Sequence, residues 1–165
     1  MAKSPSPEGI EVRCPSLIGP AQTYPAREVR FRPAAYGVWI AQGRVLLGRS
    51  VFTRKWDIPG GAVEPWETLE AGLVREFQEE TGALVRVGPL VDFRDEFIAF
   101  FRHPYHSLRF YYLVEGDPEA PLRPDPDEVS TLSWLAWHEI DPRDCQAGDY
   151  ALLQRLMTGG STAAP

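Results

Sequence analysis

The chain has 165 residues, of which 44% are hydrophobic and 24% charged, and its 17 Lys+Arg against 23 Asp+Glu give a formal net charge of −6. This length suits one domain with a substantial core, and the composition excludes both a disordered protein and a membrane protein. The negative charge disfavours binding to polymeric nucleic acid, whose phosphates it repels.

The sequence carries no targeting or membrane signal that we can recognise. No apolar stretch approaches the ~20 residues of a spanning helix, and the start MAKSPSPEGIEV lacks the apolar segment of a signal peptide. The two cysteines, Cys14 and Cys145, are too few and too far apart for a disulfide framework or a zinc site. We therefore expect a cytoplasmic protein that does not bind a membrane.

The predicted elements begin after a proline-rich segment. Residues 1–33 contain six prolines, which predicts an extended N-terminal extension with a short strand near residues 10–13. Residues 34–41 and 45–47 are expected to form two strands, joined by a hairpin turn at Gln42 and Gly43. Residues 68–81 have the pattern of a helix that ends at Gly82.

The second half of the chain predicts further strands and a short closing helix. Strands are expected at 84–93, 96–101, 107–115 and 129–137, loops at 103–106 and 116–128, and a helix at 150–157. This order predicts an α/β fold, with the extension at 1–33, one domain at 34–158 and a flexible tail at 159–165.

Three glutamates of the predicted helix stand out. Glu76, Glu79 and Glu80 are spaced i, i+3 and i+4, so they project from one side, where each like-charge pair costs roughly 0.2–0.5 kcal/mol. Their position near the helix C-terminus also opposes the helix dipole. A hard divalent cation would resolve this conflict, and Gly60 and Gly61 would let bare backbone approach a ligand. The alternative is an ordinary solvated acidic face.

The segment as a whole resembles the Nudix box. The fixed identities of that motif are all present at the family's spacing, in Gly61, Glu67, Arg75, Glu76, Glu79, Glu80 and Gly82. Phe77 fills the first bulky apolar position, while Ala83 is smaller than the aliphatic residue usual at the last. The resemblance extends from about residue 34 to 157 and implies a Nudix-type α/β/α sandwich with a mixed β-sheet and the Nudix loop–helix–loop.

The resemblance also implies a reaction and a metal. The domain would hydrolyse the diphosphate linkage of a nucleoside diphosphate joined to another moiety, X, with Mg²⁺ or Mn²⁺. Glu76, Glu79, Glu80 and the carbonyl of Gly60 would be the metal ligands. A small nucleotide diphosphate is the expected partner, and whether residues 1–33 exchange into a homodimer is left open.

Other catalytic roles follow from the same resemblance. Arg75 and Glu67 match the pair that braces the loop and orients the catalytic carboxylates. Glu79 or Glu80 is expected to act as the general base. Glu128, just before a predicted strand, is the candidate base outside the motif, and its alternative is an ordinary charged loop residue.

The sequence gives weaker indications of the residues that bind the substrate. Arg49 and Arg54 are candidates for phosphate binding and Trp39 for stacking on a base, each against the alternative of a solvated arginine or a core tryptophan. No subfamily signature follows the motif, so the sequence does not identify the moiety X. The alternative function is a non-catalytic nucleotide-sensing Nudix domain that regulates a partner.

Overall fold

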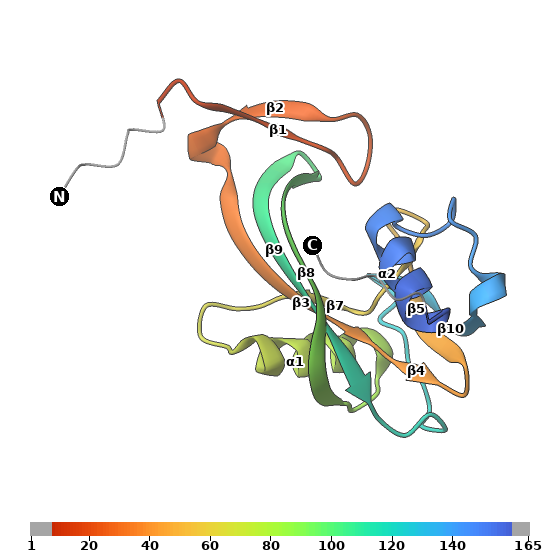
Figure 1. Ribbon diagram of the computed structural model, residues 1–165. Helices are drawn as coiled ribbons and strands as arrows, with labels where there is room; N and C mark the ends of the chain where they lie inside the picture. The colour runs from red at the N-terminus through yellow and green to blue at the C-terminus, as the bar shows by residue number, and fades with distance from the viewer. Residues whose placement is uncertain (1–7, 160–165) are drawn as a thin grey trace.

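Residues 8–159 are described in the computed structural model, where strands of three sheets combine with two α-helices (Figure 1). The largest sheet has the order β7-β3-β9-β8, formed by Gly60–Ala62, Arg30–Val38, His103–Glu115 and Arg86–Phe100. β3 and β9 run parallel and the other pairs antiparallel, so the sheet is mixed, as predicted.

A second sheet has the order β10-β5-β4, formed by Val129–Ala136, Arg44–Ser50 and Ile40–Ala41, with β6 (Trp56–Asp57) also paired to β5. The predicted turn between β4 and β5 is present, since Gln42 and Gly43 have φ of 50° and 74°. The two helices are α1 (Leu69–Thr81) and α2 (Ala147–Met157). No helix among the described residues is both long and apolar enough to cross a membrane.

Helix α1 begins and ends where the sequence predicts. The Thr68 hydroxyl accepts a hydrogen bond from the Ala71 amide at 3.2 Å, which caps the N-terminus. Gly82 adopts the left-handed conformation, with φ of 74°, and terminates the helix. Leu73 and Phe77 are fully buried and fix the helix against one core. The adjoining acidic side of α1 is thereby held in one orientation.

The sheets lie between two cores, and each core is covered by one helix. The first core joins Leu73 and Phe77 of α1 to Leu46 and Val114. The second joins Leu152 and Leu153 of α2 to residues of β3, β5 and β9. This layering is the α/β sandwich that the sequence predicts. Helix α2 begins at Ala147, three residues before the predicted start.

Two predictions in the second half of the chain are wrong. The predicted strands at 84–93 and 96–101 form one strand, β8, and the loop predicted at 103–106 is the start of β9. The turn between them consists of Phe101 and Arg102, which have φ of 46° and 65°. Such two-residue hairpin turns favour Asn and Gly, so Phe-Arg gave no turn signal.

The N-terminal region is ordered into a hairpin. β1 (Glu11–Cys14), close to the predicted strand, pairs antiparallel with β2 (Gln22–Pro25), which the sequence did not predict. We call residues 8–29 the arm. In Figure 1 the arm lies across the ends of β8 and β9. The predicted tail at 159–165 lies outside the described residues except for Gly159.

Candidate active site

A cavity of about 320 Å³ opens between the two main sheets. Both helices, both sheets and the arm contribute to its walls. Its lining consists of Leu17, Arg32, Tyr36, Gly48, Ser50, Phe52, Thr53, Asp57, Ile58, Pro59, Gly60, Gly61, Ala62, Glu76, Glu80, Phe100, Arg109, Glu128, Val129, Gln146 and Asp149. This composition combines a carboxylate-rich end, two arginines and several apolar side chains.

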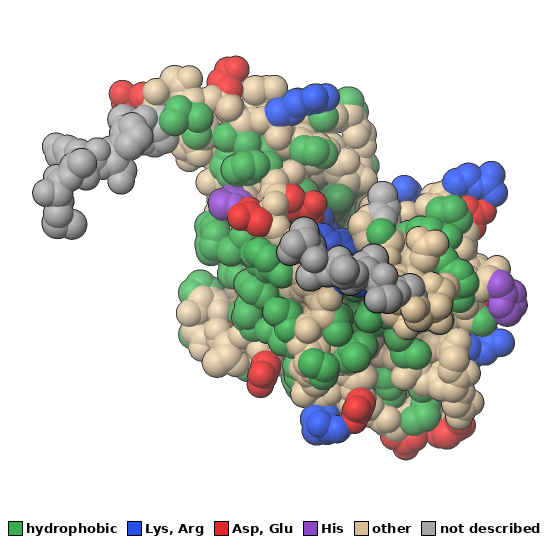
Figure 2. Space-filling view, in the orientation of Figure 1, with side chains coloured by type: hydrophobic (Ala, Val, Ile, Leu, Met, Phe, Trp, Pro, Cys, Tyr) green, Lys and Arg blue, Asp and Glu red, His purple; other side chains and the backbone are tan. Residues whose placement is uncertain are grey.

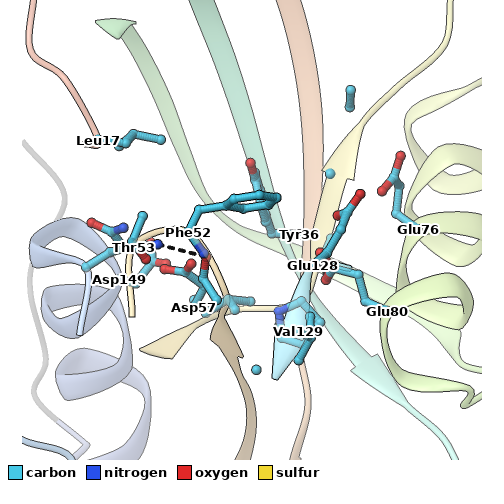
Figure 3. Close-up of a pocket in the computed structure, with 18 of the residues that line it drawn as sticks. Leu17, Tyr36, Phe52, Thr53, Asp57, Glu76, Glu80, Glu128, Val129 and Asp149 are labelled. Atoms are coloured by element: carbon cyan, nitrogen blue, oxygen red, sulfur yellow. Dashed lines mark hydrogen bonds between the residues drawn. The ribbon is translucent and has the colours of Figure 1, made fainter. Parts of the chain in front are cut away.

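Figure 3 shows that the acidic groups fall into two sets. Glu76, Glu80 and Glu128 gather on the side of α1, while Asp57 and Asp149 lie on the side of α2. The Phe52 ring lies between the two sets in this view. We call the first set the acidic end of the cavity, and the side of Asp57 and Asp149 the far end.

Glu80 is the most deeply placed carboxylate of the acidic end. Its Oε2 accepts a hydrogen bond from the Gly60 amide at 2.9 Å. Burial raises the pKa of Glu80 to about 8, and repulsion from Glu128, Glu76 and Asp57 adds to the effect. A carboxyl group with this pKa is mostly protonated at neutral pH unless a cation is nearby.

The glycines before α1 are required by close packing. Gly60 has φ of 138°, and a Cβ there would lie 2.3 Å from the Ala35 carbonyl oxygen. A Cβ at Gly61 would lie 2.3 Å from Glu76 Oε2. The backbone leaves no room for a side chain at Gly60, whereas a side chain at Gly61 would have to displace the Glu76 carboxylate.

Arg75 joins the loop before α1 to the helix. Its guanidinium donates to both Glu67 oxygens, at 2.7 and 2.8 Å, and to the Ala62 carbonyl at 3.1 Å. It also donates to Glu76 at 2.7 Å and to Glu79 at 3.0 Å. These bonds with Arg75 lower the pKa of Glu67 to about 2, so Glu67 remains ionised. The Glu79 side chain is 57% exposed and is bound by Arg75 outside the cavity lining.

Glu128 reaches the cavity from the loop before β10. Its carbonyl accepts a hydrogen bond from the Val51 amide at 2.9 Å, which ties this loop to the end of β5. Burial raises the pKa of Glu128, and repulsion from the Glu76 carboxylate raises it further. The fold thus brings together Glu76, Glu80 and Glu128, which the sequence singled out from two separate segments.

The structure does not bring the three predicted substrate residues to the cavity. Trp39 is 2% exposed and packs between Phe77 and Trp134 in the core. Arg49 pairs with Asp144 at 3.6 Å. Arg54 lies in the turn after β5, with φ of 62°. None of the three belongs to the cavity lining.

Two other arginines line the cavity and carried no sequence signal. Arg32 comes from β3 and Arg109 from the neighbouring strand β9, so only their pairing brings them together. The Arg109 side chain is 14% exposed and forms an ion pair with Glu96. Its Nε is buried and has no hydrogen-bond partner among the described residues. Arg109 thus places a positive charge in the wall of the cavity.

The far end is rich in hydrogen-bond acceptors. Burial and the neighbouring Asp149 raise the pKa of Asp57 to about 7. Asp57 Oδ1 is buried and has no hydrogen-bond partner within residues 8–159. Asp149 accepts from Arg94 at 2.8 Å and from the Tyr111 hydroxyl at 3.1 Å. Asp57 lies four residues before the motif that begins at Gly61, and nothing in the sequence indicated a carboxylate in this cavity.

The donor set of the acidic end fits a hard divalent cation. Glu76, Glu80, Glu128 and the Gly60 carbonyl offer oxygen ligands, which Mg²⁺ prefers. Burial and mutual repulsion of the carboxylates raise the pKa values of Glu80 and Glu128, and a bound cation would relieve that repulsion. As they are arranged within residues 8–159, no three His, Cys, Asp or Glu side chains stand close enough to hold an ion.

Comparison with known proteins gives consistent matches. The family model of the NUDIX domain matches residues 30–156. The chain is 29% identical over 118 residues to a MutT-like protein of Streptomyces ambofaciens, covering 72% of this chain and 71% of that protein. It is 28% identical over 102 residues to phosphatase NudJ of Escherichia coli, covering 61% of this chain and 65% of that protein. The crystal structure of a MutT NUDIX hydrolase from Burkholderia pseudomallei matches with a TM-score of 0.61 and 25% identity, covering 76% of this chain and 98% of that one.

Proposed function

Because the chain belongs to the Nudix hydrolase family, we propose that it cleaves the diphosphate linkage of a nucleoside diphosphate joined to another moiety, X, with Mg²⁺ or Mn²⁺. One observation carries this proposal. Glu80 is half-buried, accepts a hydrogen bond from the Gly60 amide and lines the acidic end of the cavity with Glu76 and Glu128. A small nucleotide is the partner that fits a cavity of about 320 Å³.

The carboxylates of the acidic end would hold the metal together with the Gly60 carbonyl. A bound divalent cation neutralises diphosphate charge and lowers the pKa of a coordinated water to near neutrality. Glu79 stays a predicted ligand, although Arg75 binds its carboxylate in this structure. Arg75 would keep Glu76 in place through the bond at 2.7 Å.

The chain itself supplies acceptors for the proton of the attacking water. Glu80 and Glu128 both line the cavity, and both have raised pKa values, which suits a general base near neutral pH. Attack forms one P–O bond, breaks the bridging P–O bond and releases a phosphomonoester and a nucleotide. Glu79 remains the other candidate base that the family resemblance implies.

The two lining arginines would bind the phosphate oxygens. Arg32 and Arg109 are cations in a cavity whose acidic groups otherwise repel phosphate. Burial of Arg109 beside Glu96 holds it in place. We therefore assign phosphate binding to Arg32 and Arg109 instead of Arg49 and Arg54.

A second candidate is a non-catalytic domain that senses a nucleotide. The observation in its favour is that the described carboxylates, as arranged, do not converge as a group of three, with Glu79 held by Arg75. In that case the cavity would bind a nucleotide without cleaving it.

A substrate panel separates the two candidates. Nucleoside triphosphates, nucleotide sugars, ADP-ribose and dinucleoside polyphosphates would be incubated with Mg²⁺, and release of phosphate or nucleotide followed, with EDTA as the matched control. If the protein is a hydrolase, at least one class of these substrates should be turned over, and that turnover should be lost in EDTA. Binding of a nucleotide without turnover of any panel member would favour the sensor.

A further inference from the structure

We propose that the arm is part of the substrate site, and that Leu17 forms an apolar wall with Phe52 and Phe100 against which the nucleobase of the substrate packs. The inference rests on the proposed function for the position of the diphosphate at the acidic end. The arm, with Leu17, lies outside the match to the NUDIX family model, which begins at residue 30.

Backbone hydrogen bonds fix the arm to the edge of β8. The Ala99 amide donates to the Pro15 carbonyl at 2.8 Å, and the Leu17 amide donates to the Ala99 carbonyl at 3.0 Å. The bonds flank a parallel bridge between Ser16 and Ala99. Ser16 Oγ also accepts from the Ile18 amide at 3.1 Å and donates to the Ile18 carbonyl at 2.6 Å. Leu17 is therefore held by the residues on both sides of it.

A small apolar cluster supports the same contact. Cys14 is fully buried, Ala99 is 1% exposed and Tyr24 is 9% exposed, and the three pack together with Val12. The cluster joins both strands of the arm to β8. Figure 2 shows the arm seated directly against the rest of the molecule. The arm is thus a fixed wall.

Leu17 shares the cavity lining with two aromatic residues. Phe52, from the segment after β5, and Phe100, at the end of β8, both line the cavity with it. The two rings pack edge to face, with centroids 5.5 Å apart. Phe52 remains 40% exposed, which leaves an aromatic surface available to a ligand. Aromatic and aliphatic walls of this kind are suited to a planar ring.

The wall is placed where a nucleobase would lie. In Figure 3, Leu17 lies on the side of Thr53, Asp57 and Asp149, away from Glu76 and Glu80. A diphosphate at the acidic end would direct its nucleoside toward this far end. Nucleobases carry N–H donors at their edges, and the carboxylates of Asp57 and Asp149 line the same end of the cavity. The far end therefore combines an apolar wall with an acceptor.

Adjacent residues of the arm provide a matched test. Leu17 lines the cavity, whereas its neighbour Ile18 is 40% exposed and lies outside the lining. Binding of GDP, ADP and inorganic pyrophosphate, each with Mg²⁺, would be measured by calorimetry for the wild type, Leu17→Ala and Ile18→Ala. We expect Leu17→Ala to weaken GDP and ADP about three- to tenfold. Pyrophosphate binding and all constants of Ile18→Ala should stay within about twofold.

Several results would overturn the inference. Equal nucleotide affinities for Leu17→Ala and Ile18→Ala would exclude a wall role, as would a lack of nucleotide binding by the wild type. An equal loss for pyrophosphate and nucleotides would show that the arm acts on the acidic end instead. Leu17→Trp, whose larger side chain fills the wall position, should also weaken the binding of GDP and ADP. It is the second variant to be measured if Leu17→Ala does not fold. Leu17-dependent binding without hydrolysis would refute the proposed function while leaving this inference intact.

Discussion

At the scale of single residues, the glutamates of one motif have opposite electrostatic environments. Hydrogen bonds from Arg75 lower the pKa of Glu67 to about 2, so Glu67 is an ionised brace. Burial raises the pKa of Glu80 to about 8, although Glu80 lies on the same motif. The residue type alone does not distinguish these two roles, because the packing of α1 against the sheet determines how far each carboxylate is buried.

The raised pKa of Glu80 makes the metal-free protein sensitive to pH. The Glu80 carboxyl has a pKa of about 8 in the folded chain and near 4.3 in the unfolded chain. The contribution of its protonated form to the free energy of unfolding is therefore complete below about pH 4.3 and is lost progressively as the pH rises to about 8. Glu80→Gln removes this cost and keeps an acceptor for the Gly60 amide. In EDTA at pH 8 we expect the variant to be about 2 kcal/mol more stable, or on the order of 5 °C in Tm.

Thermal unfolding in EDTA at pH 5 and pH 8 checks this prediction. The stabilisation by Glu80→Gln should shrink at pH 5, where the folded wild type already carries the proton. A variant that is equally stable to the wild type at both pH values would show that Glu80 is not buried as described.

The arginine assignment can be tested by comparing two positions. Arg32→Gln removes a cation from the cavity lining, whereas Arg54→Gln removes one that lies outside it. We expect the KM of the best panel substrate to rise about tenfold for Arg32→Gln and to stay near the wild-type value for Arg54→Gln. Steady-state kinetics would contradict the assignment if the two effects were reversed.

Part of the site was predictable at the residue scale. The glutamates and glycines of the motif are close in sequence, so their spacing predicts their placement on one helix and one turn. Arg32 lies on β3, Asp57 on β6 and Leu17 between β1 and β2, so only the tertiary packing of distant segments brings them to one cavity. Trp39 was a reasonable candidate for stacking, but packing against Phe77 buries it.

At the scale of elements, the contact between β7 and α1 determines the position of Glu76. Gly61 of β7 touches the carboxylate of Glu76, while Leu73 and Phe77 hold the helix from its buried side. The strand and the helix thereby form one unit around the acidic end. A change in β7 is expected to act on the helix carboxylates without unfolding the helix.

Gly61→Ala tests this unit. The new Cβ would displace Glu76 Oε2, which is the far end of a flexible side chain, so the free energy of unfolding should change by about 1 kcal/mol or less. We expect kcat to fall at least about tenfold because Glu76 is misplaced. Paired measurements of kcat and Tm check the prediction, and unchanged kcat would separate Gly61 from the site.

The elements themselves were predictable to different degrees. Helix α1 has a threonine cap, an apolar stripe and a terminal glycine, and all three signals agree with its observed limits. The β8–β9 hairpin was misread because its turn, Phe101 and Arg102, adopts positive φ without glycine. Local propensity fails there because pairing of two long strands dictates the turn.

At the scale of the whole molecule, the arm belongs to the folded body. The sequence predicted an extended segment because its prolines obscure the pairing of β1 with β2. Cys14 of the arm is fully buried, and Cys145 near α2 is 1% exposed. Burial raises the pKa of both thiols, that of Cys145 to about 12, so neither should react in the native state.

Thiol labelling therefore reports on arm docking. With an aromatic disulfide reagent at pH 8, we expect the native protein to react slowly and two thiols per chain to react rapidly in denaturant. Cys14→Ser and Cys145→Ser assign each signal. Rapid labelling of Cys14 in the native protein would show that the arm does not stay on β8.

The central claim is that the carboxylates at the acidic end of the cavity support hydrolysis of a diphosphate. It is tested most directly by kcat with saturating Mg²⁺ for Glu80→Gln and for Glu70→Gln, whose exposed carboxylate lies on the same helix outside the cavity. We predict a loss of at least about 100-fold for Glu80→Gln with its folded structure retained, and a change within about twofold for Glu70→Gln. Turnover by Glu80→Gln at the wild-type rate would contradict the account.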